Sequence, residues 1–280
     1  MKYLLEFSIG CIIICFYILN NLLKYNEDLS TFFQIYEGKY KEHFSEINLN
    51  VNFINKNDLI NILKNDNDNY YKTFFKKDLD TRKIKSIEEY FNYIENSASD
   101  FTKEEIKKLL KCIKIADKKI DNIKLDWFDG KKANKIVWKI GCIKGTLYEN
   151  GLPHTRNDII LISKDYLKNN DIRIIKTLIH EKVHIYQKIY ISDTDKFIKY
   201  YNYTILKERD KDDNIRANPD LNNFIYKDNN NNINKAIYNS NPKNIEDITY
   251  YPINNQSYEH PFEKMAIDIE NYDKSRFSFT

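Results

Sequence analysis

The sequence lacks several features that commonly point to a function. Its four cysteines include no C-x-x-C pair, which excludes a zinc ribbon and a thioredoxin-like redox motif. Lys and Arg total 44 against 41 Asp and Glu, and the two signs are mixed along the chain, so no basic block supports binding to nucleic acid. The sequence contains no internal repeat. Because 42% of its 280 residues are hydrophobic and 14% are aromatic, the composition is that of a folded protein.

An apolar segment lies at the N-terminus. The run FSIGCIIICFYIL (residues 7–19) is shorter than the roughly 20 residues of an ideal membrane-spanning helix, but flanking leucines extend it to a marginal spanning length. No small-residue cleavage site follows it, which favours an uncleaved anchor over a signal peptide. We therefore expect residues 1–23 to be a signal-anchor or transmembrane segment of a single-pass membrane protein. The alternative is a buried N-terminal helix.

Helical patterns dominate the next hundred residues, so we expect residues 24–130 to form a helical N-terminal region. The clearest helix covers residues 100–119, where Thr102 and Glu105 have the spacing of a capping box. Weaker helical patterns cover residues 31–44, 57–66 and 86–97.

The pattern changes after residue 130, where β-rich runs are separated by turn residues. Strands are expected at residues 135–143, 146–149 and 157–163. Helices are expected at residues 171–190 and 260–272, the second with Pro261 at its first position. Residues 200–256, with an Asn-rich tract, read as a long loop region with brief strands. The predicted class is α+β, with a domain at residues 131–280 built on a small mixed sheet.

The stretch TLIHEKVHIYQK carries the clearest chemical signal in the chain. His180 and His184 are four residues apart, so in a helix both imidazoles lie on one face and can reach one ion. Glu181 lies beside that point without occupying it, which suits a base that takes a proton from a metal-bound water. The plainer alternative is a core helix whose two histidines are satisfied by hydrogen bonds.

A catalytic zinc needs a third protein ligand, and the sequence offers several. Glu263 in PFEKMAID is our choice, because a small residue, Ala266, one turn later would let two helices approach closely. The alternative explanation of Glu263 is a carboxylate favoured by the dipole at a helix N-terminus. Glu259 and His260 are the other candidates. A di-iron site is excluded because the chain contains no second E-x-x-H motif.

These motifs resemble a known family. HEKVHIYQ followed by HPFEKMA is similar to the gluzincin branch of the HExxH zinc metallopeptidases. With YENGLPHTRNDIILIS added, residues 135–270 resemble predicted peptidases encoded by large DNA viruses. The resemblance implies a zincin-like domain in which the edge strand of the sheet lies antiparallel to a bound peptide. GLPHTRNDIIL would then supply that strand, and His154 and Arg156 would line the substrate cleft.

The sequence departs from the family at two points. Many gluzincins carry an acidic residue four positions after the third ligand, where it orients a zinc-bound histidine. Here that position is Ile267, and Asp268 comes one later. The residue that would stabilise the oxyanion is also not identified. Tyr251, Tyr258 and His260 are candidates because they lie near Glu263 in the sequence.

The sequence therefore predicts a membrane-anchored zinc metallopeptidase that acts on a peptide or protein. Zn²⁺ would be held by His180, His184 and Glu263, with Glu181 as general base. A second hypothesis is a catalytically inactive zincin-fold protein with a binding or structural role in a membrane or virion. A third is a helical membrane-associated protein without metal.

Overall fold

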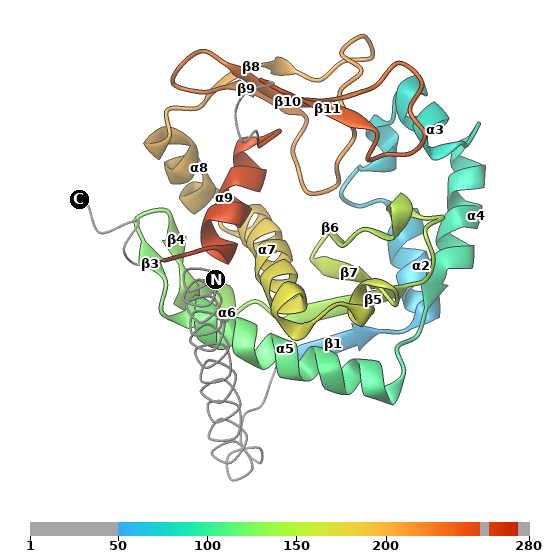
Figure 1. Cartoon of the computed structure of the whole chain (residues 1–280), viewed down its shortest axis with the longest axis vertical. Helices are drawn as coiled ribbons and strands as arrows, with labels where there is room; N and C mark the ends of the chain where they lie inside the picture. Colours follow the sequence, from blue (N-terminus) through green and yellow to red (C-terminus); the bar gives the residue numbers. More distant parts are fainter. Residues whose placement is uncertain (1–49, 253–257, 274–280) are drawn as a thin grey trace, which may run out of the picture. The chain divides into compact units, whose positions relative to one another are not determined.

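The computed structural model describes residues 50–252 and 258–273 (Figure 1). The expected membrane segment at residues 1–23 and the expected helix at residues 31–44 lie outside this range. Within it, no helix is both long enough and apolar enough to cross a membrane.

A small mixed sheet forms the base of the fold. Its main path has the strand order β1-β5-β7-β6, and β2 also pairs with β5. The pairs β1–β5 and β5–β7 are parallel, whereas β6 runs antiparallel to β7 on the outer edge. Both β5 and β7 are apolar and almost wholly buried, as expected for strands covered on both faces. The strands of this sheet are β1 (Val51–Ile54), β2 (Ala98–Ser99), β5 (Trp138–Ile143), β6 (His154–Arg156) and β7 (Ile159–Ser163).

The predicted α+β class and small mixed sheet are confirmed, and two of the three expected strands are present as β5 and β7. The strand expected at residues 146–149 is wrong. Glu149 begins a short 3-10 turn (Glu149–Gly151) and has a left-handed backbone, with φ at 44°. Its carboxylate turns into the protein to meet the guanidinium of Arg82 at 2.8 Å. An alternating pattern cannot reveal this buried ion pair.

The first half of the described chain supplies five helices, of which α2 contacts β2 and β5 of this sheet. The capping box expected at Thr102 and Glu105 is present at the start of α5. Residue 130 was the expected boundary between two regions, but β1 comes before it, β5 comes after it, and the two strands pair. Elements on both sides of residue 130 therefore belong to one compact unit. The helices concerned are α2 (Lys56–Asn65), α3 (Lys76–Arg82), α4 (Ile87–Ser97), α5 (Lys103–Asp121) and α6 (Gly130–Asn134), with 3-10 turns at Tyr71–Thr73 and Tyr166–Lys168 and a short hairpin of β3 (Lys124–Leu125) and β4 (Phe128–Asp129).

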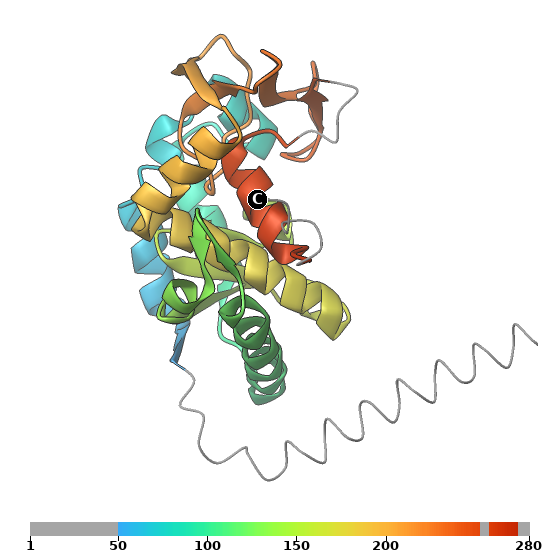
Figure 2. The ribbon, with the colours of Figure 1, turned by 90° about the vertical axis from the view of Figure 1, so that its left-hand side faces the viewer.

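Two helices then bring the HExxH motif and its proposed third ligand together. Helix α7 (Asp171–Ile189) is capped by Asn170, whose side chain accepts a hydrogen bond from the Arg173 amide. Helix α9 (Pro261–Glu270) lies against α7 in both views (Figures 1 and 2). Ala266 on α9 is fully buried. The helices predicted at residues 171–190 and 260–272 correspond to α7 and α9.

A second sheet occupies much of the region that was expected to be a long loop region with brief strands. Its four antiparallel strands have the order β11-β10-β9-β8. The Asn-rich tract forms the hairpin between β9 and β10, where the Asp228 side chain accepts hydrogen bonds from the amides of Asn230 and Asn232. Because β8 is exposed throughout, its sequence carries little hydrophobic pattern. The elements of this region are α8 (Ile191–Tyr200), β8 (Thr204–Glu208), β9 (Phe224–Lys227), β10 (Ile233–Tyr238) and β11 (Ile248–Tyr251).

Candidate metal centre

The two histidines of the HExxH motif face each other on α7. The Nε2 atoms of His180 and His184 are 3.0 Å apart, as the i,i+4 spacing predicts. Glu263, in the first turn of α9, adds a carboxylate whose Oε2 lies 3.3 Å from His180 Nε2 and whose Oε1 lies 3.9 Å from His184 Nε2. Tetrahedral zinc with bonds of about 2.0–2.1 Å places its ligand atoms about 3.3 Å from one another. One donor atom from each side chain lies within 4.8 Å of the other two, so the three side chains approach the spacing of a zinc ligand set.

Each of the three side chains is held by a partner. His180 Nδ1 contacts a carboxylate oxygen of Glu270 at 3.0 Å, and His184 Nδ1 contacts Gln187 Oε1 at 2.9 Å. Asn218 donates a hydrogen bond to Glu263 Oε1 at 3.1 Å. Partners of this kind fix ring orientation and raise the basicity of metal ligands.

These partners also determine the tautomers of the two rings. The Gln187 amide donates from Nε2 to the carbonyl of Phe262 at 2.9 Å, so its oxygen faces His184 and accepts from Nδ1–H. A carboxylate at His180 Nδ1 likewise requires a proton on that nitrogen. In the neutral rings, both Nε2 lone pairs therefore point toward each other and toward Glu263. Such a cluster of acceptors needs a cation at its centre.

The pKa shifts indicate which side chains of the site carry a proton when no metal is bound. Burial lowers the pKa of His184, which keeps this ring neutral. Burial opposes charge on His180 too, but hydrogen bonds to Glu263 and Glu270 outweigh it and raise the pKa of His180 well above its usual value. Burial acts against the Glu263 carboxylate, yet the hydrogen bond from His180 and the nearby positive charges lower its pKa. A proton on His180 thus supplies the positive charge that a metal ion would bring.

Glu181 lies next to the ligand set and is not part of it. It is buried, and its Oε2 has no hydrogen-bond partner among residues 50–252 and 258–273. Burial and the nearby Asp220 carboxylate raise the pKa of Glu181. A carboxylate in this setting is suited to accept a proton from a bound ligand.

A cavity of about 320 Å³ lies at the candidate metal centre. Its lining includes His180, Glu181 and Glu263 of the motif, together with the segment Arg216–Asp220. His154 also lines this cavity, and its Nε2 is a second buried atom without a partner in the described structure.

Arg156, the other residue expected in the cleft, lies elsewhere. Its guanidinium is fully buried and does not line the cavity. It donates to Asp66 at 2.7 Å and to Asp68 at 2.7 and 2.8 Å. Arg156 therefore joins β6 to the loop after α2.

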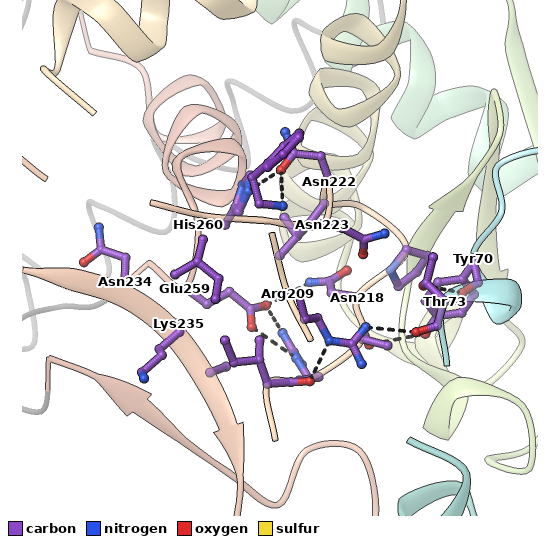
Figure 3. A pocket seen from close by; sticks show the side chains of 18 of the residues that line it. Tyr70, Thr73, Arg209, Asn218, Asn222, Asn223, Asn234, Lys235, Glu259 and His260 are labelled. Atoms are coloured by element: carbon purple, nitrogen blue, oxygen red, sulfur yellow. Dashed lines mark hydrogen bonds and ion pairs between the residues drawn. The ribbon is translucent and has the colours of Figure 1, made fainter. Parts of the chain in front are cut away.

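The other candidates for the third ligand have different partners (Figure 3). Glu259 accepts hydrogen bonds from Arg216 and Asn218. His260 is the N-cap of α9: its Nδ1 accepts from the Phe262 amide, and Nε2 lies 3.0 Å from Asn222 Oδ1. Both line a neighbouring polar cavity of about 270 Å³.

Neither tyrosine proposed for the oxyanion, Tyr251 or Tyr258, lines the metal cavity. The tyrosine that does so is Tyr166, whose hydroxyl shares a hydrogen bond with Thr177. No motif or spacing in the sequence pointed to Tyr166. Glu270 could have been found, because it lies seven residues after Glu263 and thus two turns along the same helix face. Asn218 has no recognisable motif.

The chain matches no protein-family model, no curated protein and no solved structure. The metal assignment therefore depends on the donor set. In the part of the chain that the structure describes, His180, His184 and Glu263 form the one group of three or more potential ligands whose donor atoms converge, all within 4.8 Å. Two imidazoles and one carboxylate are ligands that a zinc ion accepts.

Proposed function

We propose that this protein is a zinc-dependent metallopeptidase. The observation that carries the proposal is the convergence of three acceptor atoms, each held by its own partner, beside a buried carboxylate without a partner in the described chain. A structural zinc site has four protein ligands, whereas a catalytic one has three and leaves a position open to a cavity. The arrangement here has three.

The chain's own groups have distinct roles in this proposal. Zinc, when bound, would lower the pKa of a coordinated water to about 7 and polarise the carbonyl of the substrate. His180, His184 and Glu263 would hold the ion, and Glu270 and Gln187 would keep the Nε2 lone pairs directed at it. Glu181 would take the proton of the attacking water and deliver it to the leaving amine. Tyr166 is the phenol of the cavity that could donate to the oxyanion.

Metal analysis and a peptide library test this function in the full-length protein. We expect about one zinc per chain, retained in Glu181→Gln and lost in His184→Ala. The matched control is His260→Asn, which changes another buried histidine but keeps an N-cap acceptor and should keep the metal. Hydrolysis should disappear in Glu181→Gln while zinc remains bound. A zinc-free wild-type protein would refute the proposal.

A catalytically inactive zincin-fold protein with a binding or structural role is the second candidate. One observation favours it: the donors lining the cavity are already engaged, since Arg216 pairs with Glu259 and Tyr166 bonds to Thr177. Zinc-loaded protein that hydrolyses no peptide in the library would support this candidate.

The membrane location is a separate proposal, and it depends on residues 1–23 alone. Carbonate extraction of membranes from cells that express the full chain tests it. The protein should stay in the membrane pellet if this segment is an anchor. Release into the supernatant would contradict it.

A further inference from the structure

The outer edge of β6 is closed to another strand. In an antiparallel pair, alternate residues of an edge strand direct their N–H groups away from the sheet. At the outer edge of β6, Thr155 N–H donates to Asp220 Oδ1 at 2.7 Å, and Asn157 N–H donates to Asp68 Oδ2 at 3.0 Å. The preceding position in this alternation is Pro153, which has no N–H.

This closure affects how a substrate can bind. An extended peptide that adds to a sheet edge needs the outward N–H groups of that edge for its own carbonyls. Here each of the three positions is either occupied by a carboxylate or is proline. The edge strand inferred from the family resemblance is present as β6, but its donors are not available to a peptide. A long substrate therefore cannot lie along β6 in the way that the resemblance implies.

The cavity wall beside this edge offers acceptors. His154 donates from Nδ1 to the Leu152 carbonyl at 2.9 Å, which leaves Nε2 as an acceptor that is buried and unpaired within the described residues. Asp220 lines the same cavity, and its carboxylate accepts two hydrogen bonds, from Thr155 N and Oγ1, both at Oδ1. Asp220 accepts from Thr155, the residue after His154 in β6, and both His154 and Asp220 line this one cavity. Two acceptors on the wall of one cavity suit an occupant that brings N–H donors.

The cationic side chains near Asp220, Lys188 and Arg216, form their hydrogen bonds and ion pairs with other groups. Lys188 donates to Thr155 Oγ1 at 2.7 Å and to the Pro219 carbonyl at 3.4 Å, and forms no ion pair with Asp220 within 4.0 Å in the described chain. Arg216, which also lines the cavity, pairs with Glu259. A second metal ion is not indicated, because the described residues contain one converging ligand group and it excludes both His154 and Asp220.

We propose that this part of the cavity binds the α-ammonium group of the substrate, with Asp220 and His154 as its acceptors. An ammonium group has three N–H donors and a positive charge, which match one carboxylate and one neutral imidazole nitrogen. The cavity volume of about 320 Å³ lies at the small end of ligand sites. The protein would therefore remove residues from the amino terminus of peptides. This inference rests on the proposed peptidase function.

Paired substrates test the inference in the full-length, zinc-loaded protein. Fluorogenic peptides are compared with a free and with an acetylated amino terminus. We expect kcat/KM to be 10- to 100-fold higher for the free amine, the usual effect of a hydrogen bond to a charged group. Asp220→Asn should remove this preference, chiefly through KM, without loss of zinc. Asp158→Asn is the matched control, because it removes a carboxylate from the β6–β7 hairpin outside the cavity and should keep the preference.

Calorimetry separates this inference from the peptidase proposal. L-leucinamide is titrated into the zinc-loaded Glu181→Gln protein and compared with N-acetyl-leucinamide. Preferential binding of the free amine that is lost in Asp220→Asn supports the ammonium site even if no peptide is hydrolysed. Equal cleavage of free and acetylated peptides by the wild-type protein would overturn the site while leaving the peptidase proposal intact. Equal binding of the two amides would also overturn it.

Discussion

Replacing Glu270 with glutamine should weaken zinc binding although Glu270 is not a proposed ligand. Its Oε2 accepts from His180 Nδ1, and its Oε1 accepts from the Asn271 amide at 3.0 Å. A glutamine can satisfy only one of these donors with its oxygen, and its NH₂ group then faces the other donor. Loss of such a partner typically lowers metal affinity 10- to 100-fold, or about 1.4–2.8 kcal/mol. We expect Glu270→Gln to fall within this range.

The control for this change is Asp268→Asn on the same helix. Asp268 is the acidic residue nearest to the position that the family pattern favours, but it bonds to Lys264 and Tyr201 and not to His180. Its replacement should change zinc affinity by less than about threefold, since it touches no ligand. Competition with a chromophoric chelator measures both variants, and circular dichroism checks that both are folded. An Asp268→Asn protein that loses as much affinity as Glu270→Gln would refute the assignment of Glu270.

Three further outcomes are expected. Arg156→Met should lower stability by about 3–5 kcal/mol in urea unfolding, because it leaves the Asp66 and Asp68 carboxylates buried without a cation, and folded protein should keep its zinc. Removal of zinc by a chelator should lower the melting temperature by about 10 °C, since free zinc at about 1,000 times Kd contributes about 4 kcal/mol. Burial opposes the charge of Glu149, but Arg82 outweighs it and lowers the pKa of Glu149 from 4.5 to about 2. The contribution of the Glu149 carboxylate to folding stability is therefore complete above pH 4.5 and is lost as the pH falls through 2. Acid unfolding of Glu149→Gln, followed by tryptophan fluorescence, should therefore be less steep over this window than that of the wild-type protein.

Periodicity was enough to predict the main elements around the candidate site. The 3.6-residue pattern and capping signals located α5, α7 and α9, and continuous apolar runs located β5 and β7. The same local rules placed His180 and His184 on one helix face. Glu263 needed an additional argument, namely that a zinc site lacking a third ligand requires a carboxylate from another helix.

The features that the sequence did not reveal depend on contacts between distant residues. Glu149 does not form the strand that its local sequence predicts, because its carboxylate pairs with Arg82, which is far away in the sequence. Asn218 reaches Glu263 from a segment whose sequence has no periodicity. Asp220 meets Thr155 across 65 positions of the chain. None of these pairs has a local pattern from which one partner could predict the other.

The packing of α9 bears on whether the site exists before the metal binds. Met265, Ala266 and Ile269 of this helix are at most 1% exposed, so apolar burial attaches α9 to the protein independently of the ion. Gln187 on α7 adds a hydrogen bond to the carbonyl of Phe262, next to Glu263. In a zinc finger, by contrast, metal binding supplies the folding free energy, because the chain cannot bury enough apolar surface alone. Here packing positions Glu263 and Glu270, and a proton on His180 stabilises the metal-free cluster. Zinc would therefore displace that proton from a site that is already assembled.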